Sequence, residues 1–240
     1  MEYYNKVIES VHVRFLKASN YKIDKPIAVQ DYQEQDNALI LLHHGTLKFG
    51  DDQEVVNEGE VIFLPKGQKK LITFGSGTKR LEISSENFSE NRRKYLQSIS
   101  FKDIKATDDD CISIINFESK VFDVVNFFNS LDIPPFIIRF NDRIAILMED
   151  IMKETEISNV GKERSLKAQT EVLVIELLRH ILKNVGTPCR LHPVISAQKG
   201  KLLGLLPARR RRARHTDAAQ RPTCGAGLPG GPAIGGRADP

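Results

Sequence analysis

The stretch from residue 39 to residue 74, LILLHHGTLKFGDDQEVVNEGEVIFLPKGQKKLITF, is the feature that most constrains how this chain folds. Short apolar runs at 39–42, 61–64 and 71–74 alternate with breaks. The breaks are Gly45, Gly50-Asp51-Asp52, Glu58-Gly59 and Pro65-Lys66-Gly67. Each run is too short for a helix, and each break contains a residue that can turn sharply. A chain that reverses this often predicts antiparallel strands assembled into a sandwich or a small barrel.

The order of these breaks resembles the motif of the cupin barrel. It is carried by Leu42-His43-His44-Gly45 and by the later run GEVIFLPKG at 59–67. The pattern is most similar to the version at the N-terminus of AraC-type transcriptional regulators, over roughly residues 10–184. In that family the barrel binds a small effector, the helices that follow form the dimer contact, and a DNA-binding domain with helix-turn-helix units comes next.

Three segments after the barrel have apolar residues at helical spacing. They are 116–129, with Phe117, Val121, Val124, Val125 and Phe128 on one stripe, then 142–153, then 162–184. The predicted fold class is therefore α+β: a small antiparallel cupin-like β-barrel followed by three helices and a disordered basic tail. The predicted domains are a barrel at 1–115, a helical dimerisation region at 116–184 and a tail at 185–240.

The tail differs in composition from the rest of the chain. Residues 185–240 contain ten Lys and Arg against two acids, nine of the 16 glycines and seven of the 11 prolines, but no aromatic residue. Such a segment cannot build a core, so it is predicted to be disordered. No helix-turn-helix pattern is found in it, and the DNA-binding domain that the resemblance implies is predicted to be missing or replaced.

The arginine cluster Arg209–Arg214 allows two interpretations. A run of this kind attracts phosphate without sequence specificity, which would suit a nucleic-acid-binding arm. The abrupt change from lysine to arginine, beside Gly and Pro enrichment, instead favours a segment translated from other coding material, through a frameshift or a fusion.

Metal ligands of the cupin type are not found at their expected places. Enzymatic cupins use histidines and a glutamate on the strands around the two glycine turns, and an HxH pair puts both rings on one face of a strand. No histidine precedes Leu39 in the adjoining stretch, and Gln68-Lys69-Lys70 follows the second turn. Adjacent His43 and His44 point to opposite faces. No metal and no cofactor are predicted; a metal-dependent cupin enzyme with atypical ligands, an isomerase or oxygenase, remains the alternative.

The cysteines indicate neither catalysis nor disulfides. Cys111 follows three aspartates, which raise a thiol pKa and oppose a nucleophilic role. Cys111, Cys189 and Cys224 are odd in number and far apart, so they predict a reducing compartment, the cytoplasm. No apolar run approaches the roughly 20 residues of a membrane span. A protein that is not an enzyme and does not bind a membrane is expected.

The sequence thus predicts the effector-binding and dimerisation part of an AraC-like regulator, with a small molecule in a metal-free barrel, a homodimer, and DNA contacted only through a domain this chain lacks. The barrel-facing candidates for effector binding are Tyr32, His43, Phe49, Lys70 and Phe74. The candidates for the dimer seam are Leu166, Leu173, Leu177 and Ile181, at helix–helix spacings on 162–184. The choice of barrel-facing residues depends on strand parity, which one residue of slip would reverse.

Overall fold

The computed structural model describes residues 8–77, 79–121 and 123–184. The strands are β1 (Val11–Ile23), β2 (Ile27–Tyr32), β3 (Asn37–His44), β4 (Leu47–Phe49), β5 (Glu54–Val56), β6 (Val61–Leu64), β7 (Lys70–Phe74), β8 (Leu81–Ser84), β9 (Leu96–Ser98), β10 (Cys111–Val121), β11 (Val125–Asn126) and β12 (Phe136–Ile138). The helices are α2 (Ser85–Asn91), the 3-10 turn η1 (Arg92–Lys94), α3 (Phe101–Ile104), α4 (Phe127–Ser130), α5 (Asp142–Glu156) and α6 (Lys162–Asn184).

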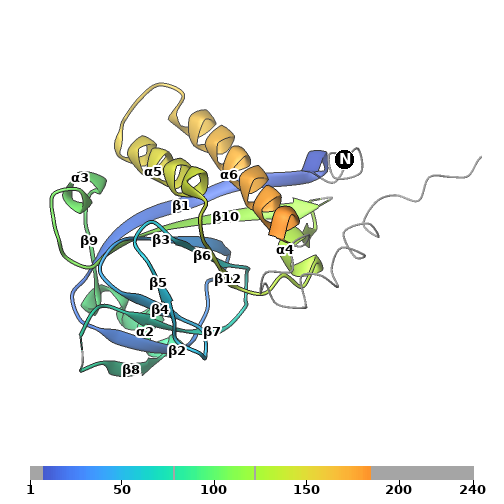
Figure 1. Cartoon of the computed structure of the whole chain (residues 1–240). Coiled ribbons are helices and arrows are strands. Elements are labelled where there is room, and N and C mark those ends of the chain that lie inside the picture. Colours follow the sequence, from blue (N-terminus) through green and yellow to red (C-terminus); the bar gives the residue numbers. More distant parts are fainter. Residues whose placement is uncertain (1–7, 78, 122, 185–240) are drawn as a thin grey trace, which may run out of the picture. The chain divides into compact units, whose positions relative to one another are not determined.

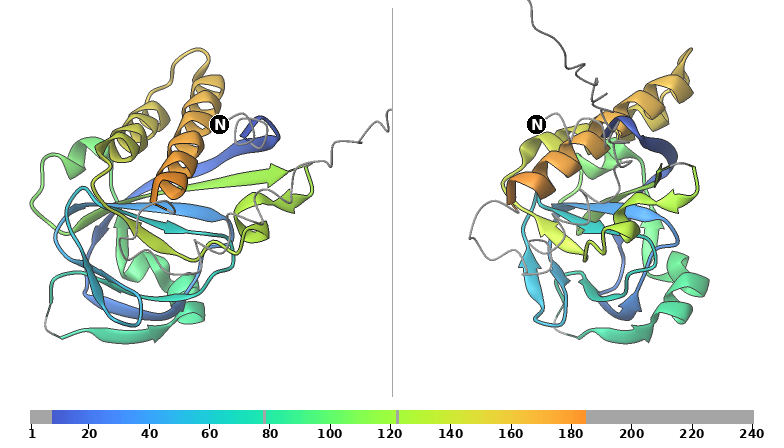
Figure 2. Two further views of the ribbon diagram at one scale, coloured as in Figure 1. Left: turned by 45° about the vertical axis from the view of Figure 1, so that its right-hand side comes forward. Right: turned by 90° about the vertical axis from the view of Figure 1, so that its right-hand side faces the viewer.

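The strands form two sheets that face each other, and α5 and α6 cover the outer face of the larger sheet (Figure 1). The larger sheet has the order β12-β6-β3-β10-β1-β9, with β11 paired to β10, and the smaller sheet has the order β5-β4-β7-β2-β8. The turned views of Figure 2 show the same three layers from two further sides. One apolar core lies between the sheets and a second lies under the helices.

Strand β3 explains the continuous apolar run of the sequence. Successive side chains of a strand point to opposite faces. Leu39 and Leu41 pack in the core under the helices, whereas Ala38, Ile40 and Leu42 pack in the core between the sheets. Because both faces of β3 are covered, every position from 38 to 42 is apolar rather than alternating.

The expected α+β class is confirmed, but the expected closed barrel is wrong. The sheets end at separate edge strands, β12 and β9 in one and β5 and β8 in the other. The chain leaves the larger sheet after Ile23 and enters the smaller one at Ile27, and Pro26 between them has no N–H to continue a ladder. The strands are also not all antiparallel, because β2 and β8 pair in parallel.

The prediction of the first of the three helices is wrong. Residues 116–121 are the second half of β10, which pairs with β1 from Val11 onward, and only the short α4 follows. Phe117 and Val121 fit a helical spacing of four, but that spacing is also two strand repeats. The alternation of buried and partly exposed positions along 117–121 shows which period the chain follows. β10 therefore runs across residue 115, where the first domain boundary was expected.

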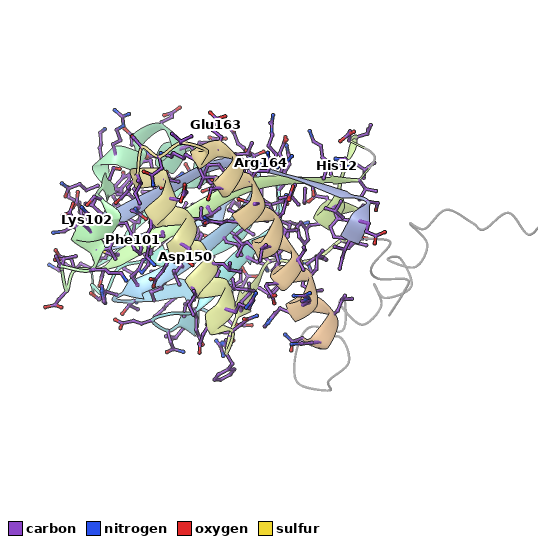
Figure 3. The ribbon with its side chains drawn as sticks, turned by 90° about the horizontal axis from the view of Figure 1, so that it is seen from above. His12, Phe101, Lys102, Asp150, Glu163 and Arg164 are labelled. Carbon is purple, nitrogen blue, oxygen red and sulfur yellow. The ribbon has the colours of Figure 1, made fainter. Side chains whose placement is uncertain are left out.

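The second and third expected helices are confirmed as α5 and α6, and α6 has the predicted bounds. Seen from above in Figure 3, the two helices lie side by side across the larger sheet. The predicted tail at 185–240, with its Arg209–Arg214 cluster, lies outside the described residues. The division of the chain into three domains stays a prediction.

Candidate functional site

The five predicted effector residues do not lie together. Tyr32, Phe49 and Phe74 belong to the core between the sheets. His43 lies on the other face of the larger sheet, 5.9 Å from the Phe101 ring between ring centroids. Lys70, at the start of β7, places its Nζ 3.3 Å from the exposed carboxylate of Asp51.

Aromatic rings fill the core around Tyr32. The Tyr32 ring lies 5.7 Å from that of Phe74 and 5.6 Å from that of Phe88, centroid to centroid, and Phe88 stacks in turn on Phe74 and Tyr95. Edge and stacked contacts at these distances are favourable packing geometries. The interior that was expected to hold an effector is thus occupied by side chains at this point.

His43 belongs to a closed polar cluster, which we call the strand cluster: Asn20, His43, Ser113 and Glu156. The Ser113 hydroxyl donates to Asn20 Oδ1 at 2.7 Å, and His43 Nε2 lies 2.7 Å from Ser113 Oγ. Since the hydroxyl proton is used toward Asn20, Nε2–H is the donor to Ser113. Burial lowers the pKa of His43 to about 4, so the ring is neutral at pH 7.

The strand cluster ends at α5. Asn20 Nδ2 donates to Glu156 Oε1 at 3.4 Å, and the backbone N–H of Phe101 donates to the same oxygen. Phe101 lies beside the helix pair in Figure 3. The cluster therefore joins strands β1, β3 and β10 to the helical layer.

A cavity of about 220 Å³ lies beside Tyr32, where the β2–β3 loop meets α2 and η1. It is lined by Lys17, Tyr32, Gln33, Glu34, Gln35, Asp36, Phe88, Ser89, Arg92 and Asn116. Buried residues form the inner wall, and exposed residues such as Lys17, Gln35 and Ser89 form the mouth. Among the five predicted effector residues, Tyr32 lines it and the other four do not.

The inner wall of this cavity carries a second polar cluster, the cavity cluster: Tyr32, Glu34, Arg92 and Asn116. The Tyr32 hydroxyl donates to Glu34 Oε1 at 2.5 Å. Arg92 Nη1 reaches the same oxygen at 3.5 Å, and Asn116 Nδ2 reaches Oε2 at 3.4 Å. Burial, followed by the charge of Glu34, raises the pKa of Tyr32 well above its ordinary value, so the phenol keeps its proton and acts as the donor.

Arg92 is held by aromatic faces more than by hydrogen bonds. Its guanidinium lies 5.0 Å from the centroid of the Tyr21 ring and 5.5 Å from that of Phe88, a cation–π arrangement. Nε is enclosed and has no hydrogen-bond partner among the described residues. Burial acts to lower the pKa of Arg92, but the electrostatic influence of the neighbouring Tyr32 and Glu34 outweighs it and raises that pKa.

Glu34, Arg92 and Asn116 were not among the sequence candidates. They come from a loop, a 3-10 turn and the strand β10, and nothing in their spacing along the chain connects them. A partial signal was present at Tyr32-Gln33-Glu34, because alternate residues on an extended segment share a face.

The four predicted dimer residues are buried within the single chain. Leu166, Leu173, Leu177 and Ile181 are at most 5% exposed and belong to the core under the helices. This inward face of α6 packs on β1 and α5. A seam between two copies that used these side chains would require that packing to open.

The described residues contain neither a cluster of metal ligands nor a membrane-spanning helix. Within them, no group of three or more His, Cys, Asp or Glu is placed to hold a metal ion. No helix in the same part of the chain is long and apolar enough to cross a membrane. Cys111 is buried, and burial raises the pKa of its thiol to about 11, as the neighbouring aspartates also do.

Comparison with known proteins gives distant structural neighbours. No family model and no curated protein matches the sequence. An apo ToxT variant from Vibrio cholerae is similar at a TM-score of 0.39 and 8% identity, over 79% of this chain and 69% of that one. Unsaturated fatty acid bound wild-type ToxT gives 0.35 and 13%, over 73% and 55%. ToxT bound to (E)-4-(8-methylnaphthalen-1-yl)but-3-enoic acid gives 0.37 and 10%, over 83% and 78%. ToxT is an AraC-family regulator.

Proposed function

We propose that this chain is the effector-binding and dimerisation part of an AraC-like transcription regulator, and that it binds a small molecule without a metal. The observation that supports the proposal is the cavity beside Tyr32. Its inner wall contains a carboxylate and an amide that are both more than nine-tenths buried, Glu34 and Asn116. Buried polar groups are normally satisfied by partners, so a polar wall around an open volume suits a ligand.

The position of the cavity supplies a route from binding to regulation. Its walls come from the β2–β3 loop and from η1 on one side, and from Lys17 on β1 and Asn116 on β10 on the other. Helix α6 packs against β1 from the helical layer. A ligand that joins the loop to these strands favours one arrangement of loop, strands and helix over another, which is a population shift.

The homodimer is proposed to form through α6, by its outward face. Ala168 and Val172 are exposed there, and Ile175 and Leu182 are partly exposed. They follow one another at helical spacings of four, three and seven, as a helix–helix contact requires. A groove of about 900 Å³ runs between this helix and β1 past Arg164 and Ala168. Arg164 is labelled at the start of α6 in Figure 3.

Contact with DNA is proposed only for a domain outside the described residues. Regulatory readout would then consist of a change in how two such domains are placed by the dimer. The alternative of a metal-dependent cupin enzyme is tested by elemental analysis of the purified chain. A stoichiometric transition metal, removed together with an enzymatic activity by a chelator, would contradict the proposal.

The binding part of the proposal is tested by thermal-shift screening of the 240-residue chain against a chemically diverse set of small metabolites. Ser89→Tyr places a large side chain at the exposed mouth of the cavity. Glu90→Tyr introduces the same side chain one residue away, at a position that lines a neighbouring cleft but not the cavity. Compounds that stabilise the wild type and Glu90→Tyr, but not Ser89→Tyr, support the cavity as the site. Compounds that stabilise all three proteins equally would place binding elsewhere.

A further inference from the structure

The charges around the cavity are balanced, and they are incompletely paired. Two carboxylates, Glu34 and Asp36, and two cations, Lys17 and Arg92, line it. Asp36 has a long pairing with Lys66, with 3.9 Å between Nζ and Oδ1. Among the described residues Lys17 has no carboxylate partner within 4.0 Å. The cavity thus offers both signs of charge to an occupant.

Glu34 keeps acceptor capacity that its neighbours do not use. An ionised carboxylate has about four lone-pair sites. The contact from Tyr32 is short, but those from Arg92 and Asn116, at 3.5 and 3.4 Å, lie beyond the ordinary range of N–H···O bonds. A donor carrying a positive charge would make the stronger, charge-assisted bond that this buried carboxylate lacks.

Arg92 keeps donor capacity in the same way. A guanidinium has five N–H donors. Here Nη1 makes one long contact, Nη2 makes none with the described residues, and the rings of Tyr21 and Phe88 lie against the group. A carboxylate is the partner that matches a fixed guanidinium fork. Because Arg92 and Glu34 are adjacent, the ligand's two charged groups must be adjacent too.

Ligands with a single net charge fit this wall poorly. A simple anion that reaches Arg92 also meets Glu34 and Asp36, and a simple cation that reaches Glu34 also meets Arg92 and Lys17. Burying a charge without a compensating partner is costly. A zwitterion with neighbouring ammonium and carboxylate groups meets an opposite charge at each end, and its net charge of zero matches the balance of the wall.

We propose that the cavity binds a free α-amino acid, with the ammonium group at Glu34 and the carboxylate at Arg92 and Lys17. This inference rests on the proposed function, that the chain captures a small molecule in this cavity. The volume of about 220 Å³ is more than ten times the roughly 15 Å³ that one water requires. Gln33, Gln35 and Ser89 at the mouth provide amides and a hydroxyl for a side chain or for bridging water.

The test is isothermal titration of the 240-residue chain with each of the coded L-amino acids. Every amino acid that binds is followed by three analogues with the same side chain: the N-acetyl acid, which is an anion, the amide, which is a cation, and the N-acetyl amide, which is neutral. The expected result is binding of at least one amino acid and a loss of about ten-fold or more for each analogue, since each lacks one charge-assisted pair.

Two substitutions locate the binding. Lys17→Met removes an exposed cation at the mouth, and Lys94→Met removes an exposed lysine that does not line the cavity. Both positions are exposed, so both variants should fold. Amino-acid affinity is expected to fall several-fold in Lys17→Met and to stay unchanged in Lys94→Met. An equal affinity in the two variants would overturn the placement of the carboxylate.

The remaining outcomes separate this inference from the function on which it rests. Three further probes are titrated in parallel. Decanoic acid is an anion with an apolar chain, D-ribose is a neutral sugar, and xylitol is a neutral polyol. If one of these probes binds and no amino acid does, the inference of a zwitterionic ligand is overturned. The effector-binding proposal then still stands, provided that Ser89→Tyr abolishes the binding of that probe. No binding by any of these probes, together with no hit in the metabolite screen, overturns both.

Discussion

The strand cluster and the cavity cluster are two largely buried polar clusters in one small fold, and they differ in how closely their members are bonded. In the strand cluster, two contacts of 2.7 Å join His43, Ser113 and Asn20, and the link from Asn20 to the exposed Glu156 is longer, at 3.4 Å. In the cavity cluster, Glu34 has one short bond and two long ones, and Arg92 Nε is unpaired among the described residues. The second cluster also forms the wall of a cavity.

This difference separates a structural role from a binding role. A polar group that is buried and fully paired contributes rigidity, because removing a partner leaves an expensive unsatisfied atom. A polar group that is buried and only partly paired beside an open volume keeps donors or acceptors that can bond a ligand. The strand cluster also connects the strands to α5, whereas the cavity cluster lies where the β2–β3 loop meets η1.

The largest expected effect comes from breaking the core under the helices. Leu173 lies on the inward face of α6 and is fully buried. Leu173→Glu therefore places an unpaired charge in the core and should cost more than about 4 kcal/mol of unfolding free energy. Urea denaturation followed by circular dichroism measures this. Ligand binding in the cavity is expected to be lost only in proportion to the unfolded fraction.

The neighbouring residue provides the matched control for the two faces of α6. Val172 is 37% exposed and points outward, so Val172→Glu should leave the unfolding free energy within about 0.5 kcal/mol of the wild type. Sedimentation should show a dimer for the wild type and a monomer for Val172→Glu. A folded, dimeric Val172→Glu variant would remove the outward face of α6 from the proposed interface.

The next largest effect is expected in the pH dependence of stability, through His43 of the strand cluster. The pKa of His43 is about 4 in the folded chain against 6.5 for an ordinary histidine, so between these values the unfolded chain binds the extra proton. Stability from this group is therefore fully present above pH 6.5 and is lost as pH falls toward 4. The loss amounts to about 3 kcal/mol at most.

Other groups titrate over the same range, so the measurement is a difference. His43→Gln keeps a donor near Ser113 but cannot take up a proton. The unfolding free energy of the wild type minus that of the variant should decrease from pH 7 to pH 4. Parallel curves for the two proteins would show that His43 is not held neutral by its surroundings.

A smaller loss is expected when the centre of the strand cluster is removed. Ser113→Ala deletes the hydroxyl that joins His43 to Asn20 and leaves both without that partner, which should cost about 2 kcal/mol. Ser119→Ala is a matched change on the same strand, where Asn37 keeps a second acceptor at the carbonyl of Phe117. The second variant should lose less, as measured by thermal unfolding.

The sequence was informative where local pattern and tertiary packing agree. The strands of residues 39–74 and the helices α5 and α6 were predictable because short apolar runs between turns and long apolar stripes each have one regular interpretation. The segment 116–121 was not, since Phe117 and Val121 satisfy the helical and the strand period together. Barrel closure was not predictable either, because it depends on which edge strands pair, and residue pattern does not encode that.

One of the sequence candidates lines the proposed cavity. Tyr32 was named as a barrel-facing aromatic, and it lies in the cavity wall. His43 was placed inward because the parity of β3 was guessed, and the buried run at 38–42, apolar on both faces, gave no clue to which face is which. Arg92 and Asn116 reach the cavity through the fold alone, so no spacing along the chain could have joined them to Glu34.

A small expected effect on stability, joined to a large effect on binding, belongs to Glu34→Gln. The amide keeps an oxygen that can accept from Tyr32, and Arg92 keeps the two aromatic faces and access to water in the cavity. The unfolding free energy should therefore change by only about 1 kcal/mol. Amino-acid affinity should fall by about ten-fold or more, because the neutral amide cannot make the charge-assisted bond to an ammonium group. Glu156→Gln, which removes the carboxylate at the end of the strand cluster, should leave affinity unchanged. If Glu34→Gln destabilised the chain as much as Ser113→Ala does and left ligand affinity intact, the two clusters would have the same structural role, and the distinction drawn between them would not hold.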